Sequence, residues 1–398
     1  MADRDRVVAY IVSAELIAAS SQLPSNKQRS STIHSLIHEL GLSKRVKVIR
    51  PVRASYKELA AYHTREYLDA VLAPQSSDAP KTPHSLSSHP ESDFGLDSDC
   101  PPFPALPAYV PLVAGASLTA AQALINGVAP VAICWDGGRH HAQKGHAAGF
   151  CYVADCVLAL MALKRAPPIA PCGRKPRIMY IDLDLHFSDA VSQAFASSSS
   201  TRIPQILTLS IHHAAPGFYP PSELATLPDP SSPSFNPFTL SLPLRAGAGP
   251  STLARIWPLV QNVKDVFSPD YIVMQCGVDA LSGDPCGVSN WSLEGLGNVV
   301  RDALAWGVPV LLLGGGGYNT PNAARAWASL TSIALNDPLP LDTPIPDHAA
   351  FPLYAPSFIL DVPAGTMQDQ NSDAYLRDVE ERFAEVVRVL KTSMAPRD

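Results

Sequence analysis

The chain has 398 residues, of which 46% are hydrophobic and 17% charged, enough apolar material for a sizeable core. Its formal net charge of −6 and pI of about 6.0 argue against direct nucleic-acid binding, which favours basic proteins. The seven cysteines form no CxxC pair, and we find neither the ~18 apolar residues of a membrane span nor an N-terminal secretory signal, so we expect a soluble, intracellular protein with free thiols.

Short apolar runs alternate along the chain with segments of helical periodicity. The runs predict strands buried on both faces of a parallel sheet, at residues 131–135, 177–185, 206–211, 271–276 and 308–313. The segments between them predict helices at roughly 114–126, 150–164, 251–266, 292–306 and 321–335. Such alternation is typical of an α/β fold with a single central parallel sheet flanked by helices.

Proline-rich segments separate these elements and predict loops, at residues 73–107, 166–176, 220–245 and 338–356. The stretch 73–93 is rich in serine and proline, which predicts a flexible surface insertion. An amphipathic pattern predicts a closing helix over residues 371–392 that packs on the body of the protein. Because the sequence contains no internal repeat, we interpret residues 1–398 as a single domain.

Each predicted strand is followed by polar or titratable residues. In an open parallel sheet, ligands bind beyond the carboxyl ends of the strands. Five strands that deliver such groups to one edge therefore predict a functional site there. In chain order these groups are His140 and His141, then Asp182, Asp184, His186 and Asp189, then His212 and His213, then Asp279, and finally Tyr318.

Three of these residues alternate along one strand. Asp182, Asp184 and His186 share a face, and buried carboxylates are costly unless a cation compensates their charge. Asp184, His186 and Asp279 would form a three-ligand site with an open fourth position, as in catalytic zinc sites. Water at such a metal becomes a nucleophile near neutral pH.

The adjacent His140 and His141 are the candidates for moving protons, and Asp182 and Asp189 are the carboxylates that remain to orient them. Tyr318 follows four glycines and could donate a hydrogen bond to an oxyanion. Taken singly, a histidine pair or a glycine turn is more often structural. Their joint placement at one sheet edge instead predicts metal-assisted hydrolysis of an amide.

The sequence resembles a zinc-dependent class I histone deacetylase. The matching stretches are GGRHHAQKGHAAGFCYVADCVLAL (137–160), YIDLDLHFSDAV (180–191), SIHHAAPGFYP (210–220), MQCGVDALSGDP (274–285), GGGGYNTPNAARAWA (314–328) and IPDHAAFPLYAPSF (345–358). The resemblance extends over about residues 7–362 and implies an arginase-like α/β sandwich. It also implies hydrolysis of N-ε-acetyl-lysine in histones and other proteins, with release of acetate, and a role in chromatin and transcription regulation in the nucleus and cytoplasm.

The same resemblance implies a role for each site residue. The implied zinc ligands are Asp184, His186 and Asp279, and the implied catalytic residues are His140, His141, Asp182, Asp189 and Tyr318. The implied substrate-binding positions are Asp99, Gly149, Phe150, Tyr219 and Cys286, and Arg29 would line an acetate-release cavity. A structural potassium ion is implied at Asp182, Asp184, His186, Ser210 and Ile211. Ferrous iron suits the metal ligands as well as zinc does.

Several positions depart from the family pattern, among them Ser188, Ala190 and the rim loop Pro220-Pro221-Ser222-Glu223. Phe187 replaces a histidine that is not a metal ligand, and Tyr219 replaces a phenylalanine, so its hydroxyl needs a partner or water. Cys286 replaces a leucine or methionine, so we expect a wider mouth. Pro285 replaces the arginine with which corepressor-bound members hold an inositol phosphate. Isoform-8-type members share this proline and act alone, so we expect a stand-alone enzyme.

Three alternatives to this interpretation need consideration. Acetylpolyamines or longer acyl-lysines could be the substrates, although polyamines would favour an acidic residue where Cys286 stands. An inactive acetyl-lysine-binding scaffold would lack a metal ligand or the tyrosine, and all of these are present. A manganese ureohydrolase would need a second cluster of bridging aspartates, whereas the sequence offers one metal site.

Overall fold

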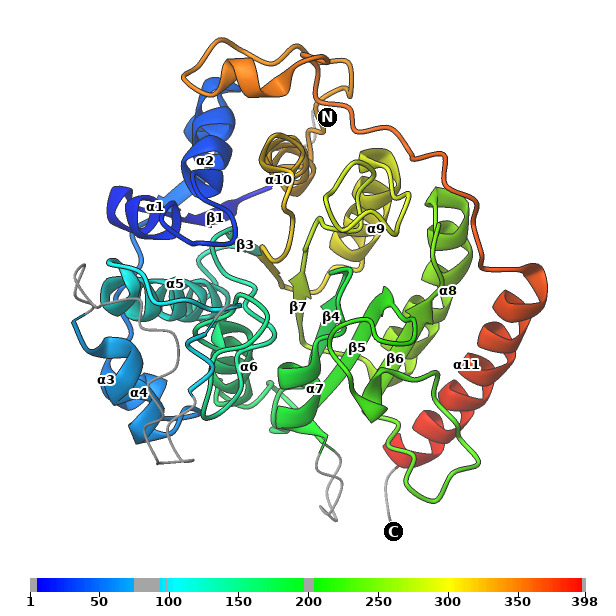
Figure 1. The fold of residues 1–398 in the computed structure, drawn as a ribbon. Coiled ribbons are helices and arrows are strands. Elements are labelled where there is room, and N and C mark those ends of the chain that lie inside the picture. Colours follow the sequence, from blue (N-terminus) through cyan, green and yellow to red (C-terminus); the bar gives the residue numbers. More distant parts are fainter. Residues whose placement is uncertain (1–5, 75–93, 98, 197–203, 396–398) are drawn as a thin grey trace, which may run out of the picture.

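The computed structural model describes residues 6–74, 94–97, 99–196 and 204–395, which form an α/β fold (Figure 1). The strands are β1 (Val8–Ile11), β2 (Lys47–Ile49), β3 (Val131–Cys134), β4 (Ile178–Asp182), β5 (Ile206–His213), β6 (Thr239–Leu244), β7 (Tyr271–Gln275) and β8 (Val310–Leu313). The helices are α1 (Ala14–Ser20), α2 (Arg29–Glu39), α3 (Tyr56–Leu59), α4 (Arg65–Leu72), α5 (Leu106–Ile125), α6 (Asp155–Lys164), α7 (Asp189–Phe195), α8 (Pro250–Phe267), α9 (Leu293–Ala305), α10 (Thr320–Ala334) and α11 (Asp373–Met394). Residues 75–93, most of the predicted insertion, lie outside the described part of the chain.

The eight strands form one sheet in the order β2-β1-β3-β8-β7-β4-β5-β6. Every neighbouring pair is parallel, so the carboxyl ends of all strands lie at the same edge. The five predicted strands are present as β3, β4, β5, β7 and β8, and the parallel α/β prediction is confirmed. Strands β1 and β2 extend one side of the sheet, and β6 extends the other.

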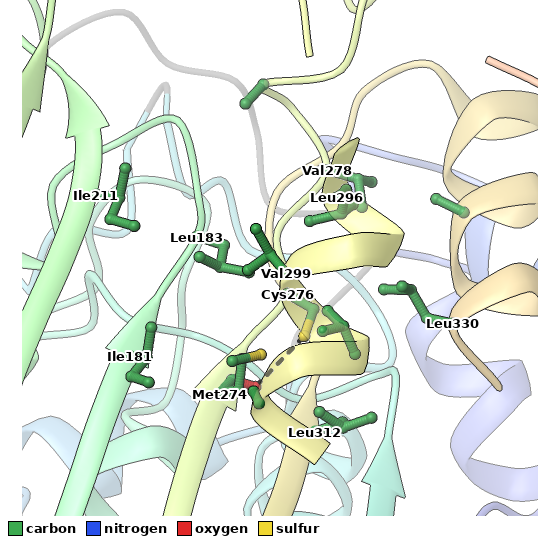
Figure 2. Packing of buried hydrophobic residues seen from close by; sticks show 14 of the residues in the cluster. Ile181, Leu183, Ile211, Met274, Cys276, Val278, Leu296, Val299, Leu312 and Leu330 are labelled. Atoms are coloured by element: carbon green, nitrogen blue, oxygen red, sulfur yellow. Dashed lines mark hydrogen bonds between the residues drawn. The ribbon is translucent and has the colours of Figure 1, made fainter. Parts of the chain in front are cut away.

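Side chains of the central strands alternate between two apolar cores, one on each face of the sheet. On one face, Ile181, Met274 and Leu312 form a row across β4, β7 and β8. Figure 2 shows this row in the cluster that also contains Val299 of α9. On the other face, Tyr180 belongs to the core that α5 and α6 cover. Full burial of each large apolar side chain contributes roughly 1.5–3 kcal/mol, so this packing holds the sheet edge rigidly.

Three of the differences from the predictions have a clear physical reason. Strand β6 lies inside the predicted 220–245 loop, because Pro243 is tolerated in an edge strand, where the missing N–H faces no partner. Helix α6 begins at Asp155 rather than at residue 150, because Phe150 has a positive φ of 63° that no helix interior adopts. Helix α5 begins at Leu106 rather than at residue 114, because Pro107 suits a first helical turn.

Helix α5 also corrects the expectation that no segment could span a membrane. It has 20 residues and is apolar enough to do so by length and composition, and 67% of its most apolar window is buried inside the protein. In the structure it is covered by α6 and the sheet, so its composition is that of a core helix.

Helix α11 occupies the predicted place of the closing helix and lies beside α8 at the outer edge of the fold (Figure 1). Its buried positions include Val379, Phe383 and Val386, which follow the predicted amphipathic pattern. Arg255 of α8 holds it through Glu380, with a 2.6 Å hydrogen bond. The helix therefore packs on the same face of the sheet as the row of Ile181, Met274 and Leu312.

Candidate active site

The site lies at the carboxyl edge of the four central strands, β3, β8, β7 and β4, which are neighbours in the sheet. The chain leaves β3 at Cys134 and β8 at Leu313, and the two following turns cross closely. A Cβ atom on Gly138 would lie 2.0 Å from the carbonyl oxygen of Gly314, so only glycine fits at this crossing. The segments with the predicted site residues are thereby brought together.

Three donor side chains converge beyond β4 and β7. Nδ1 of His186 lies 3.3 Å from Oδ1 of Asp184 and 2.9 Å from Oδ2 of Asp279. Both carboxylates are buried. Burial and the neighbouring Asp184 raise the pKa of Asp279 to about 7, which reflects the need for a positive charge between them. One imidazole nitrogen and two carboxylates fit a divalent cation such as zinc or ferrous iron.

The backbone and one amide side chain orient these donors. Oδ2 of Asp184 accepts hydrogen bonds from Nε2 of Gln275 at 2.8 Å and from the N–H of Gly316 at 2.7 Å. Oδ1 of Asp279 accepts the N–H of Leu185 at 2.8 Å. These bonds occupy one oxygen of each carboxylate and leave the other facing His186. Such supporting contacts fix ligand orientation in metal sites.

The His186 ring is fixed from its other side by Phe218. The two rings are stacked, with centroids 5.1 Å apart and an interplanar angle of 10°. Phe187, the departure from the family pattern, is buried and packs on His212 with ring centroids 4.8 Å apart. The substitution therefore lies outside the donor set and leaves the three donors in place.

The two histidines have different carboxylate partners and different proton affinities. Nδ1 of His140 lies 2.9 Å from Asp182, and Nδ1 of His141 lies 2.7 Å from Asp189. Burial lowers the pKa of His140, but Asp182 and Asp184 outweigh it and raise the value to about 9. Burial and the neighbouring His140 lower the pKa of His141 to about 4. At neutral pH, His141 is therefore the one free to accept a proton.

Each pair extends to a further side chain. The hydroxyl of Tyr180 donates to Oδ2 of Asp182 at 2.5 Å, and Nε2 of Gln143 donates to Oδ2 of Asp189 at 2.8 Å. Buried carboxylates need such partners because an unsatisfied buried acceptor costs about 1–3 kcal/mol. The two networks thus hold the imidazoles in fixed orientations.

Tyr318 is held at its backbone by a loop carboxylate. Its N–H donates to Oδ2 of Asp284 at 2.7 Å, and its ring meets Phe150 edge to face with centroids 5.6 Å apart. Burial, with Asp279 and Asp184, raises the pKa of Tyr318 well above its usual range. The phenol therefore stays protonated and can donate a hydrogen bond toward the donor cluster.

A hollow of about 320 Å³ opens beside these groups and is lined in part by Asp97, Asp99, Gly149 and Tyr219. Asp99 is exposed at its rim. Tyr219 packs edge to face on His141, with ring centroids 5.0 Å apart. Of the predicted rim and wall positions, Asp99, Gly149 and Tyr219 therefore line one hollow beside His141.

Comparison with known proteins agrees with this geometry. The family described as Histone deacetylase domain matches residues 23–334 of the chain. The chain belongs to the histone deacetylase family. It is 36% identical to histone deacetylase 8 of Danio rerio, over 94% of each chain. It is 34% identical to histone deacetylase 8 of Xenopus tropicalis, over 93% of this chain and 95% of that protein, and 33% identical to the Xenopus laevis protein, over 84% and 96%.

Arg29 of this deacetylase lies behind the glycine turn that precedes Tyr318. Its guanidinium donates to the carbonyl oxygen of Gly317 at 2.8 Å and lies 4.9 Å above the ring of Trp327. Burial and the nearby Arg139 lower its pKa to about 10, so it stays charged at neutral pH. The structure thus places Arg29 on the interior side of the site.

The predicted potassium positions come from two neighbouring strands. Asp182 of β4 is paired with Ser210 of β5, and Ile211 follows. The predicted strand 177–185 ends at Asp182, so Asp184 and His186, two of the metal donors, lie on the turn that follows β4. Potassium at these residues stays a prediction.

Sequence reasoning missed the residues that position the deacetylase site, which are Gln143, Tyr180, Phe218, Gln275 and Asp284. Gln275 left one signal, a glutamine inside the apolar run YIVMQC. Asp284 left no such signal in the sequence, because its role depends on the shape of the loop before Tyr318.

Proposed function

We propose that this member of the family is a metal-dependent lysine deacetylase that cleaves the amide of N-ε-acetyl-lysine in histones and other proteins and releases acetate. The observation that carries the proposal is the convergence of Asp184, His186 and Asp279 next to the neutral His141 and the protonated Tyr318. Amide hydrolysis needs a polarised carbonyl, an activated water and a proton donor, and this arrangement supplies a group for each.

Asp184, His186 and Asp279 would hold zinc or ferrous iron. Such a cation supplies Lewis acidity toward the acetyl carbonyl and the attacking water. The side chains then have to stabilise the negative charge that develops and transfer the protons. Tyr318 donates a hydrogen bond to the oxygen that becomes negative, and its high pKa keeps the proton available.

His141 accepts the proton of the attacking water, because its low pKa leaves the ring neutral at pH 7. Asp189, 2.7 Å from Nδ1, stabilises the imidazolium that forms. His141 then returns the proton to the departing lysine amine. His140, with its pKa raised to about 9, stays protonated beside Asp182 and contributes a positive charge to the oxyanion.

The substrate is proposed to enter through the hollow at Tyr219 and Gly149, with Asp99 holding the substrate backbone at the rim. Phe150, whose ring meets that of Tyr318, is proposed as the other wall. Arg29 is proposed to attract the acetate product. A structural potassium ion at Asp182, Asp184, His186, Ser210 and Ile211 completes the proposal.

Acetylated histone tails and other acetyl-lysine proteins are the proposed partners, in the nucleus and cytoplasm. The enzyme is proposed to act in chromatin and transcription regulation without an inositol-phosphate-dependent corepressor. Pro285 supports this, because a proline offers no positive charge for a phosphate.

The test is a deacylation panel on purified, metal-analysed protein, with an acetyl-lysine peptide, longer acyl-lysine peptides and N-acetylputrescine. We expect turnover of the acetyl-lysine peptide and a loss of about 10²–10³ in kcat for Tyr318→Phe. Tyr271→Phe is the matched control, because Tyr271 begins β7 at the opposite edge of the sheet. Turnover of N-acetylputrescine alone would instead identify a polyamine deacetylase. Near-native turnover by Tyr318→Phe would contradict the tyrosine's role.

A further inference from the structure

The thiol of Cys286 lies close to two of the three metal donors, His186 and Asp279. Its Sγ atom, a ring nitrogen of His186 and a carboxylate oxygen of Asp279 all lie within 4.8 Å of one another. The side chain is half-buried and packs against the core. Sulfur, imidazole nitrogen and carboxylate oxygen around one point form a donor set that divalent zinc, iron and cobalt accept.

The distances among these three donor atoms are close to those between the ligands of a bound metal ion. With metal–sulfur bonds of about 2.3 Å and metal–oxygen bonds of about 2.0 Å, tetrahedral donors lie about 3.5 Å apart. The sulfur therefore needs to approach by no more than about 1.3 Å. The segment is built for such a shift, since Gly283 and Gly287 flank it with φ angles of +81° and +62° and their own positions are uncrowded.

We propose that Cys286 is a displaceable fourth ligand of the metal. With the tunnel empty, the thiol releases its proton to solvent and the sulfur binds the cation. An entering acyl-lysine displaces the sulfur, which regains a proton. The inference rests on the proposed function, since it requires a cation at Asp184, His186 and Asp279. It assigns this enzyme a self-capped resting state that a leucine or methionine at position 286 does not provide.

The loop geometry couples this thiol to Tyr318. Oδ1 of Asp284 accepts the N–H of Cys286 at 3.0 Å, and Oδ2 accepts the N–H of Tyr318 at 2.7 Å and that of Asn319 at 3.3 Å. One carboxylate therefore holds both segments. Movement of the sulfur onto the cation pulls on the group that orients the tyrosine, so capping and catalytic alignment oppose each other.

Cobalt(II) loading of the full chain gives a readout that does not depend on turnover. We expect a near-ultraviolet sulfur-to-cobalt charge-transfer band in the wild type, lost in Cys286→Leu and Cys286→Ser. Cys172→Ser is the matched control and keeps the band, because Cys172 is an exposed free thiol. An acetyl-lysine peptide added at saturation removes the band. Equal spectra for the wild type and Cys286→Leu, each with one cobalt bound, would overturn the proposal.

Alkylation by iodoacetamide provides a second measurement, followed by peptide mass spectrometry. Zinc loading should slow alkylation of Cys286 at least tenfold and leave Cys172 unchanged as the control within the same chain. An unchanged rate at Cys286 would contradict ligation. Turnover of acetyl-lysine without a sulfur-to-cobalt band would contradict only the ligand role of Cys286. Failure to bind either cobalt or zinc would contradict the proposed function as well.

Discussion

Gly149 and His141 are packed so tightly that a Cβ atom at position 149 would lie 2.4 Å from Cδ2 of the His141 ring. Real Cβ atoms essentially never come within 3.0 Å of a heavy atom outside their own residue and its chain neighbours. The backbone of Gly149 is also left-handed, with φ of +52°. Gly149 and the imidazole of His141, the proposed proton acceptor, therefore lie in direct contact, and a side chain at position 149 would have to displace the ring.

This contact predicts that Gly149→Ala displaces the His141 ring and lowers kcat/KM on an acetyl-lysine peptide by about 10² or more, since misplacement by about 1 Å has that effect. Steady-state kinetics and metal analysis check it. Gly127→Ala is the control, because Gly127 has φ of +64° with no atom within 4 Å of a Cβ. It carries the backbone strain without the clash, and an equal loss in both variants would contradict the prediction.

Asp284 is expected to position Tyr318 without touching the substrate. Asp284→Ala removes a charged acceptor from the Tyr318 N–H, and a hydrogen bond to a charged group contributes about 1.5–3 kcal/mol. We expect kcat to fall about 10–10²-fold while KM changes little, with partial recovery in Asp284→Asn, which keeps an acceptor oxygen. A fall confined to KM would argue against a positioning role.

Substitutions of Gln275 and Gln143 should distinguish an effect on metal binding from an effect on proton transfer. Gln275 supports the donor Asp184, whereas Gln143 supports Asp189, the partner of His141. Gln275→Leu should weaken metal affinity about 10–100-fold, measured by competition with a chelator. Gln143→Leu should leave affinity unchanged and lower kcat. Equal affinities in both variants would show that the Asp184 contact does not tune the metal.

The stability of the fold should depend on pH through His63. Its Nε2 accepts the N–H of Ala154 at 3.0 Å, and burial lowers its pKa from 6.5 to about 4. Between pH 6.5 and 4 the unfolded chain therefore binds more protons than the folded one, so stability falls as the pH falls through this window, by up to about 3 kcal/mol from this residue.

Urea unfolding of chelator-treated protein at pH 7 and pH 4.5 measures this effect. In His63→Gln the side-chain oxygen can still accept the Ala154 N–H but does not titrate, so the loss of stability on acidification should be smaller than in the wild type. Parallel losses in the two proteins would exclude His63 as a contributor.

The side chains that meet at the sheet edge could be predicted because each follows an apolar run. Asp184, Asp279 and Tyr318 need only the rule that parallel strands end at one edge. Their partners could not be predicted in this way. Asp284 binds backbone groups through a loop whose path depends on the left-handed Gly283, and Phe218 stacks on His186 across a turn that has no periodic signal.

The predictions of where elements begin and end were wrong where one residue was unusual for its place in the fold. The segment before α6 has helical composition, yet Phe150 with its positive φ lies in a tight turn closed by the bridge between Ala148 and Cys151. Pro243 reads as a loop residue, yet β6 is an edge strand that tolerates it. In both places the tertiary structure, which the sequence does not reveal, overrides the local secondary-structure propensity.

Strand β8 lies between β3 and β7, although it follows both of them in the chain. As the ribosome releases the protein, β3, β4 and β7 emerge first, and β3 has no hydrogen-bonded route to β7 until Val310–Leu313 arrive. The sheet edge that places Nε2 of His140 3.7 Å from Oδ1 of Asp184 is incomplete before that insertion, and Tyr318 emerges just afterwards. The complete site is therefore assembled last, and a nascent or truncated chain that ends before β8 holds its carboxylates without the means to use them.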